Sequence, residues 1–194
     1  TTMAVVAEQL TNLENNQRHN LFVPARGGIG EAVTVQANSV SARMATKASG
    51  NHRALYVPEQ LSLATYNSLL NEPSIQEVLN LISQANCVIH SIGRALHMAA
   101  RRKMTEKELV MLKQANAVAE SFGYFFNENG EVVYKVPRIG IELKDLANVP
   151  IILAIAGGKS KAKAIRAYMK NAPKQTWLIT DEATAKEILK GVSL

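Results

Sequence analysis

The strongest signal of a buried strand in this chain is Ile151-Ile152-Leu153-Ala154-Ile155-Ala156, which runs directly into Gly157-Gly158. A short apolar run of this kind is typical of a parallel strand that is covered on both faces. A helical pattern follows over residues 160–170, and a further strand is predicted over residues 176–179. This order of strand, helix and strand favours an α/β fold with a parallel sheet.

The rest of the chain alternates strands and helices in the same way. The spacing of apolar residues predicts helices over residues 2–14 and 31–48, and helical stretches that begin at Pro58, at Pro73, at the capping box Thr105-Glu106-Lys107-Glu108 and at Asp181. Strands are predicted over residues 20–23, 53–57 and 86–91, and a hairpin around residues 127–130. We therefore expect an α/β fold whose mainly parallel sheet has helices on both faces, with a small antiparallel hairpin insertion.

Length and composition predict one ordinary globular domain, since the chain has 194 residues, of which 47% are hydrophobic and 20% charged. No apolar run approaches the roughly 18 residues of a membrane span, and no signal peptide is present, so we expect a cytoplasmic protein without membrane association. The single cysteine, Cys87, cannot form an internal disulfide, and its place in an apolar strand pattern favours a buried structural thiol. Because the sequence starts at Thr1 without a methionine, we expect a piece of a longer protein.

The net charge of +6 is compatible with anionic small ligands or with nucleic acid. Aromatic residues make up only 5% and do not interleave with the basic runs, which excludes a stacking platform for single strands. One basic stripe is formed by Lys159, Lys163, Arg166 and Lys170, spaced along one helix face. A solvent-exposed helix face is the usual explanation of such a stripe, and direct DNA binding by the stripe is the alternative.

Two predicted strands end in loops that combine glycines with basic residues. Pro24-Ala25-Arg26-Gly27-Gly28 follows the strand at 20–23, and Gly157-Gly158-Lys159-Ser160-Lys161 follows the strand at 151–156. Ligands of open α/β sheets bind beyond the carboxyl ends of the strands. Glycine permits close approach of a backbone, and Arg and Lys donate to phosphate. A tight turn with a surface Arg remains the alternative for the first loop, but the pair of loops favours an anion site.

The residues around these loops have two interpretations each. Lys161 lies on a different helix face from the basic stripe and should point inward, either to a phosphate near the helix N-terminus or with its stem packed and its ammonium in water. Thr1-Thr2 stands at the start of the first helix. These threonines could cap the helix N-terminus or form part of a second phosphate-binding site. Gln36 could turn toward the first loop, and Glu120 could cap, pair with an Arg or accept from ligand hydroxyls.

Motifs for metal binding and for nucleophilic catalysis are absent from the sequence. The four histidines are scattered without partners at ligand spacing, and there is no Gly-x-Ser-x-Gly elbow or Walker loop. Gly28-Ile29-Gly30 is followed by Val33 instead of a third glycine, so a dinucleotide fingerprint fails. We expect no metal, no cofactor and no catalytic residues.

Seven motifs follow one another along nearly the whole chain: Phe22-Val23-Pro24-Ala25-Arg26-Gly27-Gly28, Val35-Gln36-Ala37-Asn38, Ala45-Thr46-Lys47-Ala48-Ser49-Gly50, Ser91-Ile92-Gly93, Glu120-Ser121-Phe122-Gly123-Tyr124, Ala156-Gly157-Gly158 and Thr180-Asp181-Glu182. In this order they resemble the effector-binding domains of the SorC family of bacterial sugar-responsive repressors, in the branch that regulates central glycolytic genes. The resemblance implies that residues 1–194 are an effector-binding domain with the fold of glucosamine-6-phosphate deaminase, ribose-5-phosphate isomerase and CoA-transferases.

The resemblance also implies partners. An N-terminal winged helix-turn-helix outside this sequence would bind operator DNA, the protein would be a dimer or tetramer, and fructose 1,6-bisphosphate or a related phosphosugar would relieve repression of a glycolytic operon. A sugar-phosphate isomerase or deaminase on the same fold is the alternative, for which Glu120 is the only general-base candidate and no histidine accompanies it.

The ligand-binding residues that the resemblance implies fall into three groups: Thr1, Thr2 and Lys161 for one phosphate; Arg26, Gly27 and Gly28 for the sugar phosphate at the other strand end; and Gln36, Arg101 and Glu120 to complete the pocket. In the family a Gly-Gly pair precedes the two threonines, and this sequence lacks it. Arg102 remains an alternative to Arg101, and Lys159 an alternative to Lys161.

Overall fold

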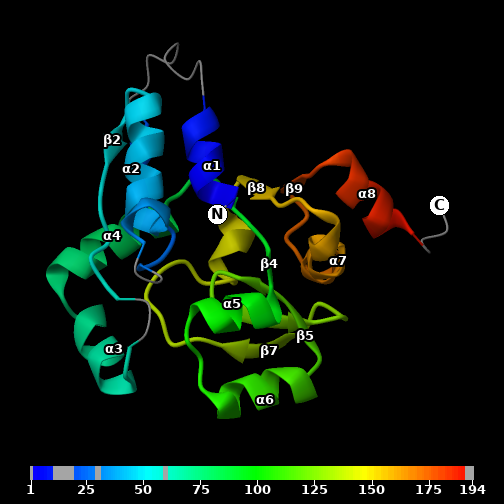
Figure 1. Cartoon of the computed structure of the whole chain (residues 1–194). Coiled ribbons are helices and arrows are strands. Elements are labelled where there is room, and N and C mark those ends of the chain that lie inside the picture. Colours follow the sequence, from blue (N-terminus) through cyan, green and yellow to red (C-terminus); the bar gives the residue numbers. More distant parts are fainter. Residues whose placement is uncertain (1, 11–19, 29–31, 59–60, 191–194) are drawn as a thin grey trace. The chain divides into compact units, whose positions relative to one another are not determined.

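The computed structural model describes residues 2–10, 20–28, 32–58 and 61–190 (Figure 1). The chain divides into two compact units. The first unit contains Thr1–Asn86 and Pro137–Asn148, and the second contains Cys87–Val136 and Val149–Leu194. Each unit holds some of the residues that the sequence marks as candidates, so each is described separately.

The first unit has a small helical core beside a short parallel sheet. Helices α1 (Thr2–Gln9) and α2 (Ala37–Lys47) bury Ala7, Val40 and Met44 against each other, and Phe22 packs on this cluster. Strands β1 (Leu21–Phe22) and β2 (Asn51–His52) pair in parallel. The other elements are η1 (Val33–Val35), α3 (Leu63–Leu70), α4 (Pro73–Ser83) and η2 (Asp145–Asn148).

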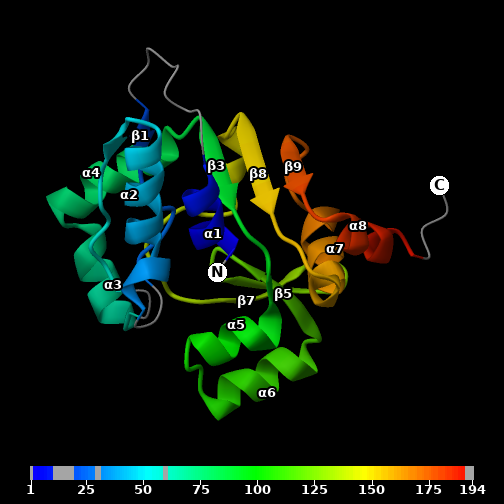
Figure 2. The ribbon, with the colours of Figure 1, turned by 45° about the horizontal axis from the view of Figure 1, so that its top comes forward.

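The second unit contains two sheets, one parallel and one antiparallel. The parallel sheet has the order β3-β8-β9, formed by Cys87–His90, Ile151–Ile155 and Thr176–Ile179 (Figure 2). The antiparallel sheet has the order β4-β5-β6-β7, formed by Gly93–Arg94, Ala117–Ser121, Tyr124–Asn127 and Val132–Lys135. Its helices are α5 (Ala95–Arg101), α6 (Glu106–Gln114), η3 (Lys159–Lys161), α7 (Ala162–Lys170) and α8 (Glu182–Leu189).

Helix α7 packs against strand β5 of the antiparallel sheet. It follows β8 and leads to β9, and its Ile165 and Tyr168 are buried. The Tyr168 hydroxyl lies 3.3 Å from Nε2 of His90, a buried residue of β3. This crossover joins parallel neighbours β8 and β9, as expected for an α/β unit, and it brings the N-terminus of α7 to the carboxyl edge of the sheet.

The predicted fold class is confirmed, and several element boundaries need correction. The helix starts at Pro73, Thr105 and Asp181 are confirmed, with a complete capping box at Thr105. The helix expected over 31–48 is shorter, because η1 and a break precede α2, and the helix expected over 160–170 begins as the 3-10 turn η3. Helix α1 ends at Gln9, and residues 11–14 of the predicted helix lie outside the described part.

The strand predicted over 53–57 is wrong, because a side chain, and not a neighbouring strand, forms hydrogen bonds with the backbone of this segment. The Asn38 amide accepts from the Leu55 N–H and donates to the Leu55 carbonyl, both at 2.9 Å, so it takes the place of a neighbouring strand. The segment that was predicted to be helical from Pro58 is helical only from Leu63, while Pro58 makes a parallel bridge to Gly28. Residues 59 and 60 lie outside the described part.

Two expectations about the second unit also change. The hairpin is confirmed, but it belongs to a four-stranded sheet, because residues 117–121 form a strand that the sequence pattern did not reveal. Cys87 is exposed instead of buried, since it begins β3, which lies at the edge of its sheet.

Candidate functional site

The loop after β1 is held closely by two other segments of the first unit. The Gly27 N–H donates to the Ile139 carbonyl at 3.3 Å, and the Gly28 N–H donates to the Val57 carbonyl at 3.2 Å. On the other side, the Ile141 N–H donates to the Ala25 carbonyl at 2.8 Å. The two glycine amides are therefore engaged within the protein, and the loop offers side chains to a ligand more readily than backbone donors.

Close packing of backbones explains the glycine at position 27. A Cβ on Gly27 would lie 2.5 Å from the Val57 carbonyl oxygen, which real Cβ atoms do not tolerate. A Cβ on Gly28 would meet only the Gln36 side chain, with Oε1 at 3.4 Å. Gln36 therefore lies beside the loop, as the sequence predicted, and half-exposed Arg26 precedes both glycines, with its backbone bridged to Gly140.

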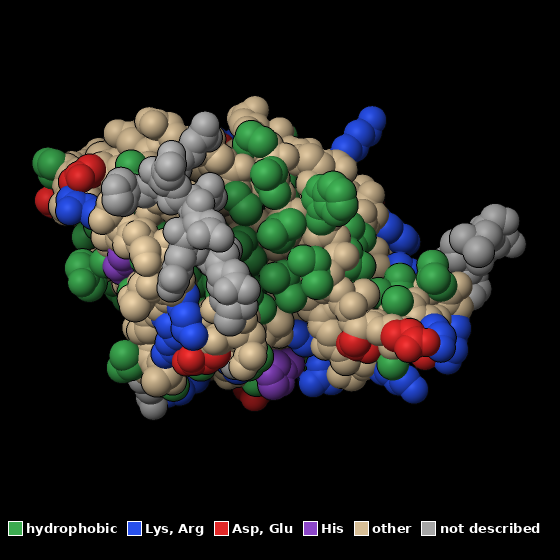
Figure 3. Space-filling model, turned by 90° about the horizontal axis from the view of Figure 1, so that it is seen from above, with side chains coloured by type: hydrophobic (Ala, Val, Ile, Leu, Met, Phe, Trp, Pro, Cys, Tyr) green, Lys and Arg blue, Asp and Glu red, His purple; other side chains and the backbone are tan. Residues whose placement is uncertain are grey.

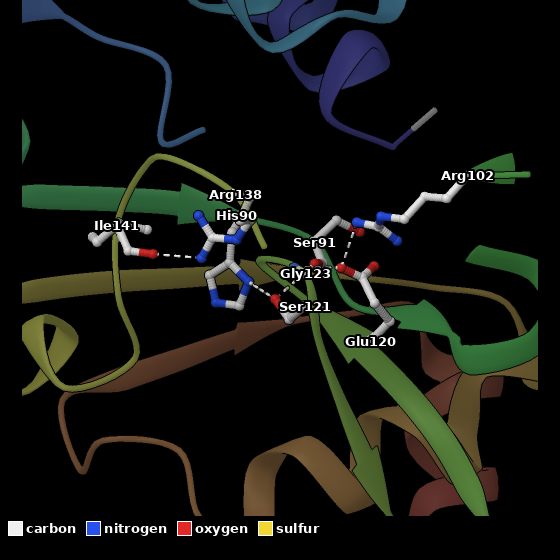
Figure 4. Close-up of polar contacts among 8 residues, drawn as sticks. All are labelled: His90, Ser91, Arg102, Glu120, Ser121, Gly123, Arg138 and Ile141. Carbon is white, nitrogen blue, oxygen red and sulfur yellow. Dashed lines mark hydrogen bonds and ion pairs between the residues drawn. The ribbon is translucent and has the colours of Figure 1, made fainter. Parts of the chain in front are cut away.

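Arg138 is a buried cation of the first unit that the sequence analysis missed. Its side chain is 1% exposed, and its Nη2 donates to the Ile141 carbonyl at 2.5 Å (Figure 4). A Cβ on Gly140 would lie 2.7 Å from Cα of Arg26 and 2.9 Å from Nη1 of Arg138, so this guanidinium supports the segment that braces the Arg26 loop. The available signal was a charged residue inside the apolar pattern of residues 136–141.

In the second unit, Glu120 forms a buried ion pair with Arg102. The Arg102 Nη2 donates to Glu120 Oε1 at 2.8 Å, and both side chains are at most 5% exposed (Figure 4). The Gly123 N–H donates to the same carboxylate oxygen at 2.7 Å. Of the alternatives left open for Glu120, the structure combines a cap with an Arg partner, and it uses Arg102 for this pair while Arg101 stays half-exposed.

A second buried polar group ends strand β3. His90 Nδ1 lies 3.0 Å from the Ser121 hydroxyl, which itself donates to the Ser91 carbonyl at 3.3 Å (Figure 4). This pattern fits a neutral imidazole that donates from Nδ1 and accepts at Nε2 from Tyr168. Burial lowers the pKa of His90 to about 4, against a smaller opposing effect of a backbone contact with Ser91. The network fixes α7 and β5 against the carboxyl end of β3.

Lys161 lies at the carboxyl edge of the parallel sheet, close to a second cation. It is half-buried, whereas Lys159 is exposed, so Lys161 is the inward-pointing lysine that the sequence predicted. Arg94 follows β3 in the segment that leads into α5, and α7 lies against this segment. Burial and then repulsion from Arg94 lower the pKa of Lys161. Two neighbouring cations at a strand edge are stabilised by an anion.

The Gly157-Gly158 loop already holds a carboxylate. Asp181 caps α8, and its Oδ2 accepts from the Gly158 N–H at 2.8 Å and from the Thr184 hydroxyl at 2.6 Å. The Thr184 hydroxyl first, and then the amides of Gly158 and Thr184, lower the pKa of Asp181 to about 2. A Cβ on Gly157 would lie 2.6 Å from this oxygen. A phosphate at this loop therefore cannot use the Gly158 N–H, because Asp181, 23 positions later in the chain, already accepts from it.

The chain matches known proteins over nearly its whole length. Residues 1–190 match the family model described as "Putative sugar-binding domain". A crystal structure of a SorC family transcriptional regulator from Enterococcus faecalis is 78% identical, with a TM-score of 0.91 over 97% of this chain and 76% of that chain. The chain belongs to the SorC family of sugar-binding regulator domains.

Two further relatives can be compared with this SorC-family domain. The "Central glycolytic genes regulator" of Bacillus subtilis (strain 168) is 50% identical over 190 residues, which are 98% of this chain and 55% of that protein. The chain thus spans about half the length of the curated relatives it matches. The sor operon regulator structure from Shigella flexneri shares the fold, with a TM-score of 0.88 at 17% identity over 97% of this chain and 77% of that chain.

Neither the matched relatives nor the geometry of Glu120 favours the enzyme alternative for this SorC-family domain. The relatives are named as transcriptional regulators, and the single general-base candidate is locked in the pair with Arg102. Within the described ranges, no three potential metal ligands cluster. None of the helices described there combines the length and the apolar character that crossing a membrane requires.

The candidate residues of this SorC-family domain group by unit. The first unit brings together Arg26, Gly27, Gly28 and Gln36, and places Thr2 at the start of α1. The second unit contains Arg101, Glu120 and Lys161. Thr1 lies outside the described residues. Sequence reasoning missed Arg94 and Arg138, although a basic residue directly after Ser91-Ile92-Gly93 is a strand-end signal of the kind that singled out Lys161.

Proposed function

We propose that this chain is the effector-sensing domain of a transcriptional repressor of glycolytic genes, and that its effector is a phosphorylated sugar such as fructose 1,6-bisphosphate. The observation that carries the proposal is the half-buried Lys161 beside Arg94 at the carboxyl edge of the parallel sheet. The 50% identity with the Bacillus subtilis regulator of central glycolytic genes supports the choice of pathway.

The chemistry of Lys161 and Arg94 suits a phosphate dianion. Burial and repulsion from Arg94 both disfavour the charged form of Lys161. A phosphate relieves both costs and accepts charge-assisted hydrogen bonds from each group. We assign this pair to a phosphate of the effector.

The proposed mechanism is a shift of populations. A sugar phosphate that binds one arrangement of the subunits more tightly favours that arrangement and thereby changes the affinity for operator DNA. DNA contacts belong to a part of the protein outside residues 1–194, and the proposed regulator is a cytoplasmic homo-oligomer. The exposed basic stripe of α7 is solvated, and its Lys163 pairs with Glu128 at 2.6 Å, which argues against a direct grip on DNA.

The test is a calorimetric titration of fructose 1,6-bisphosphate into the wild-type chain, Lys161→Gln and Lys159→Gln. Both lysines belong to η3, so the pair separates position from net charge. We expect Lys161→Gln to weaken binding by about 10-fold or more, as the loss of a charge-assisted hydrogen bond does, and Lys159→Gln to stay within about twofold. Equal affinity of wild type and Lys161→Gln would contradict the assignment.

A further inference from the structure

Lys161 differs from the other lysines of the chain in its surroundings. It is half-buried, whereas the other twelve lysines are exposed. Figure 3 shows that exposed Lys and Arg side chains are scattered over one face of the molecule. A small reagent that attacked amines according to exposure alone would therefore modify many lysines and would reach Lys161 last.

The position of Lys161 favours the neutral form of its amine. Lys161 ends η3 and is the N-cap of α7, where the helix dipole places partial positive charge. Burial and then repulsion from Arg94 lower the pKa of the amine. A lysine that is desolvated and lies beside another cation is activated as a nucleophile, because the neutral amine carries the reacting lone pair.

There is room for a small anion beside Lys161. The Lys161 N–H donates to the Gly158 carbonyl at 2.8 Å, so the Gly157-Gly158 loop adjoins this residue. Both glycines are exposed, and a Cβ on Gly158 would meet no atom within 4 Å. Arg94 is exposed at the end of β4, and α7 lies against this strand. A small reagent can therefore use the Arg94 cation while it reacts with the Lys161 amine.

An acyl phosphate has the two groups that suit this pair, a phosphate and an activated acyl carbon. We propose that Lys161 is a modification site for small acyl phosphates, at which Arg94 holds the phosphate end of the reagent by charge-assisted hydrogen bonds. The Lys161 lone pair attacks the acyl carbon and forms a C–N bond, and the C–O bond to the phosphate breaks. The phosphate leaves with the bonding electron pair, which Arg94 stabilises, and the nitrogen releases its proton to the phosphate or to water. The products are an N-acyl lysine and inorganic phosphate.

Acylation of Lys161 would also reduce effector binding, a consequence that rests on the proposed function. The product is an uncharged amide, which has lost the charge-assisted hydrogen bond to phosphate. The acylated domain should therefore bind fructose 1,6-bisphosphate about 10-fold or more weakly, as Lys161→Gln does. The acyl transfer itself needs no effector, so its selectivity is measurable whether or not fructose 1,6-bisphosphate binds.

Acetyl phosphate is the probe for this site. The wild-type protein is incubated with acetyl phosphate near neutral pH without effector, and acetylation is followed by tandem mass spectrometry after digestion with a protease that does not cleave at lysine. Lys159 belongs to the same turn, η3, and serves as the internal control. Lys161 should react at least about fivefold faster than Lys159 although it is less exposed, because each unit by which a pKa falls gives about ten times more neutral amine. A rate equal to or below that of Lys159 would overturn the proposal.

Two matched variants and a second reagent test the role of Arg94. Arg94→Gln should lower the Lys161 rate by about fivefold or more, because it removes both the phosphate anchor and the repulsion, whereas Lys159 should react as in the wild type. Arg166→Gln, which removes an exposed cation of α7, should leave the Lys161 rate unchanged. With acetic anhydride, which has no phosphate, the ratio of the Lys161 rate to the Lys159 rate should fall. An unchanged Lys161 rate in Arg94→Gln, an equal decrease in Arg166→Gln, or the same ratio with both reagents would overturn the proposal.

Discussion

Lowering the pH from 7.5 to 4.5 should destabilise this protein through His90. The folded imidazole is buried among Ser121, Tyr168 and Phe122, and its pKa falls from 6.5 to about 4. Because the folded pKa lies below the unfolded one, the unfolded state takes up the proton first. The stabilisation is complete well above pH 6.5 and is lost as the pH falls toward 4.

The two pKa values set the size of the effect. They differ by about 2.5, and about 1.36 kcal/mol per pH unit gives a total of about 3.4 kcal/mol. At pH 5 about 2 kcal/mol of this is already lost, because the unfolded imidazole is then almost fully protonated and the folded one is not. A protein of ordinary stability would lose a substantial part of its free energy of unfolding.

Urea unfolding followed by far-UV circular dichroism at pH 7.5, 6, 5 and 4.5 measures the effect. His90→Gln cannot take up the proton, so its free energy of unfolding should change less with pH over this range. The matched control is His97→Gln, at an exposed position of α5, which should retain the wild-type pH dependence. An unchanged pH dependence in His90→Gln would refute the reasoning.

Two further predictions concern the scaffold of the site, both measured by urea unfolding. Arg102→Ala should cost about 3–5 kcal/mol, because it leaves the Glu120 carboxylate buried without its cation, whereas Arg101→Ala should change stability by less than about 0.5 kcal/mol. Equal losses of stability in the two variants would show that the Arg102–Glu120 ion pair does not stabilise the fold. Gly27→Ala should destabilise by about 1–3 kcal/mol through its clash with a backbone carbonyl, and Gly28→Ala should be tolerated. A stable Gly27→Ala protein would mean that the loop is free to move.

The sequence was sufficient where a local pattern determined the outcome. The apolar run Ile151–Ile155 predicted a parallel strand, although Ile151 is exposed, and helical spacing placed Lys161 inward and Lys159 in solvent. Thr105 and Asp181 correctly predicted the starts of their helices, because a capping side chain and the amides from which it accepts lie within one helical turn. These features depend on residues that are neighbours in the chain.

The sequence was insufficient where the partner lies far away in the chain. The Gly158 amide looked free because its acceptor, Asp181, is 23 residues distant. The Gly27 amide is engaged by Ile139, and the strand expected at 53–57 is replaced by contacts with the Asn38 amide. Local propensity and hydrophobic periodicity do not predict such long-range contacts, since these contacts form only when the elements pack together.

The central claim is that this domain senses a phosphorylated sugar, and one calorimetric comparison tests it most directly. Fructose 1,6-bisphosphate and unphosphorylated fructose are titrated into the same wild-type preparation. The charged neighbours Lys161 and Arg94 predict saturable binding of the bisphosphate and no measurable heat of binding for fructose. Equal binding of the two sugars, or no binding of the bisphosphate, would contradict the account.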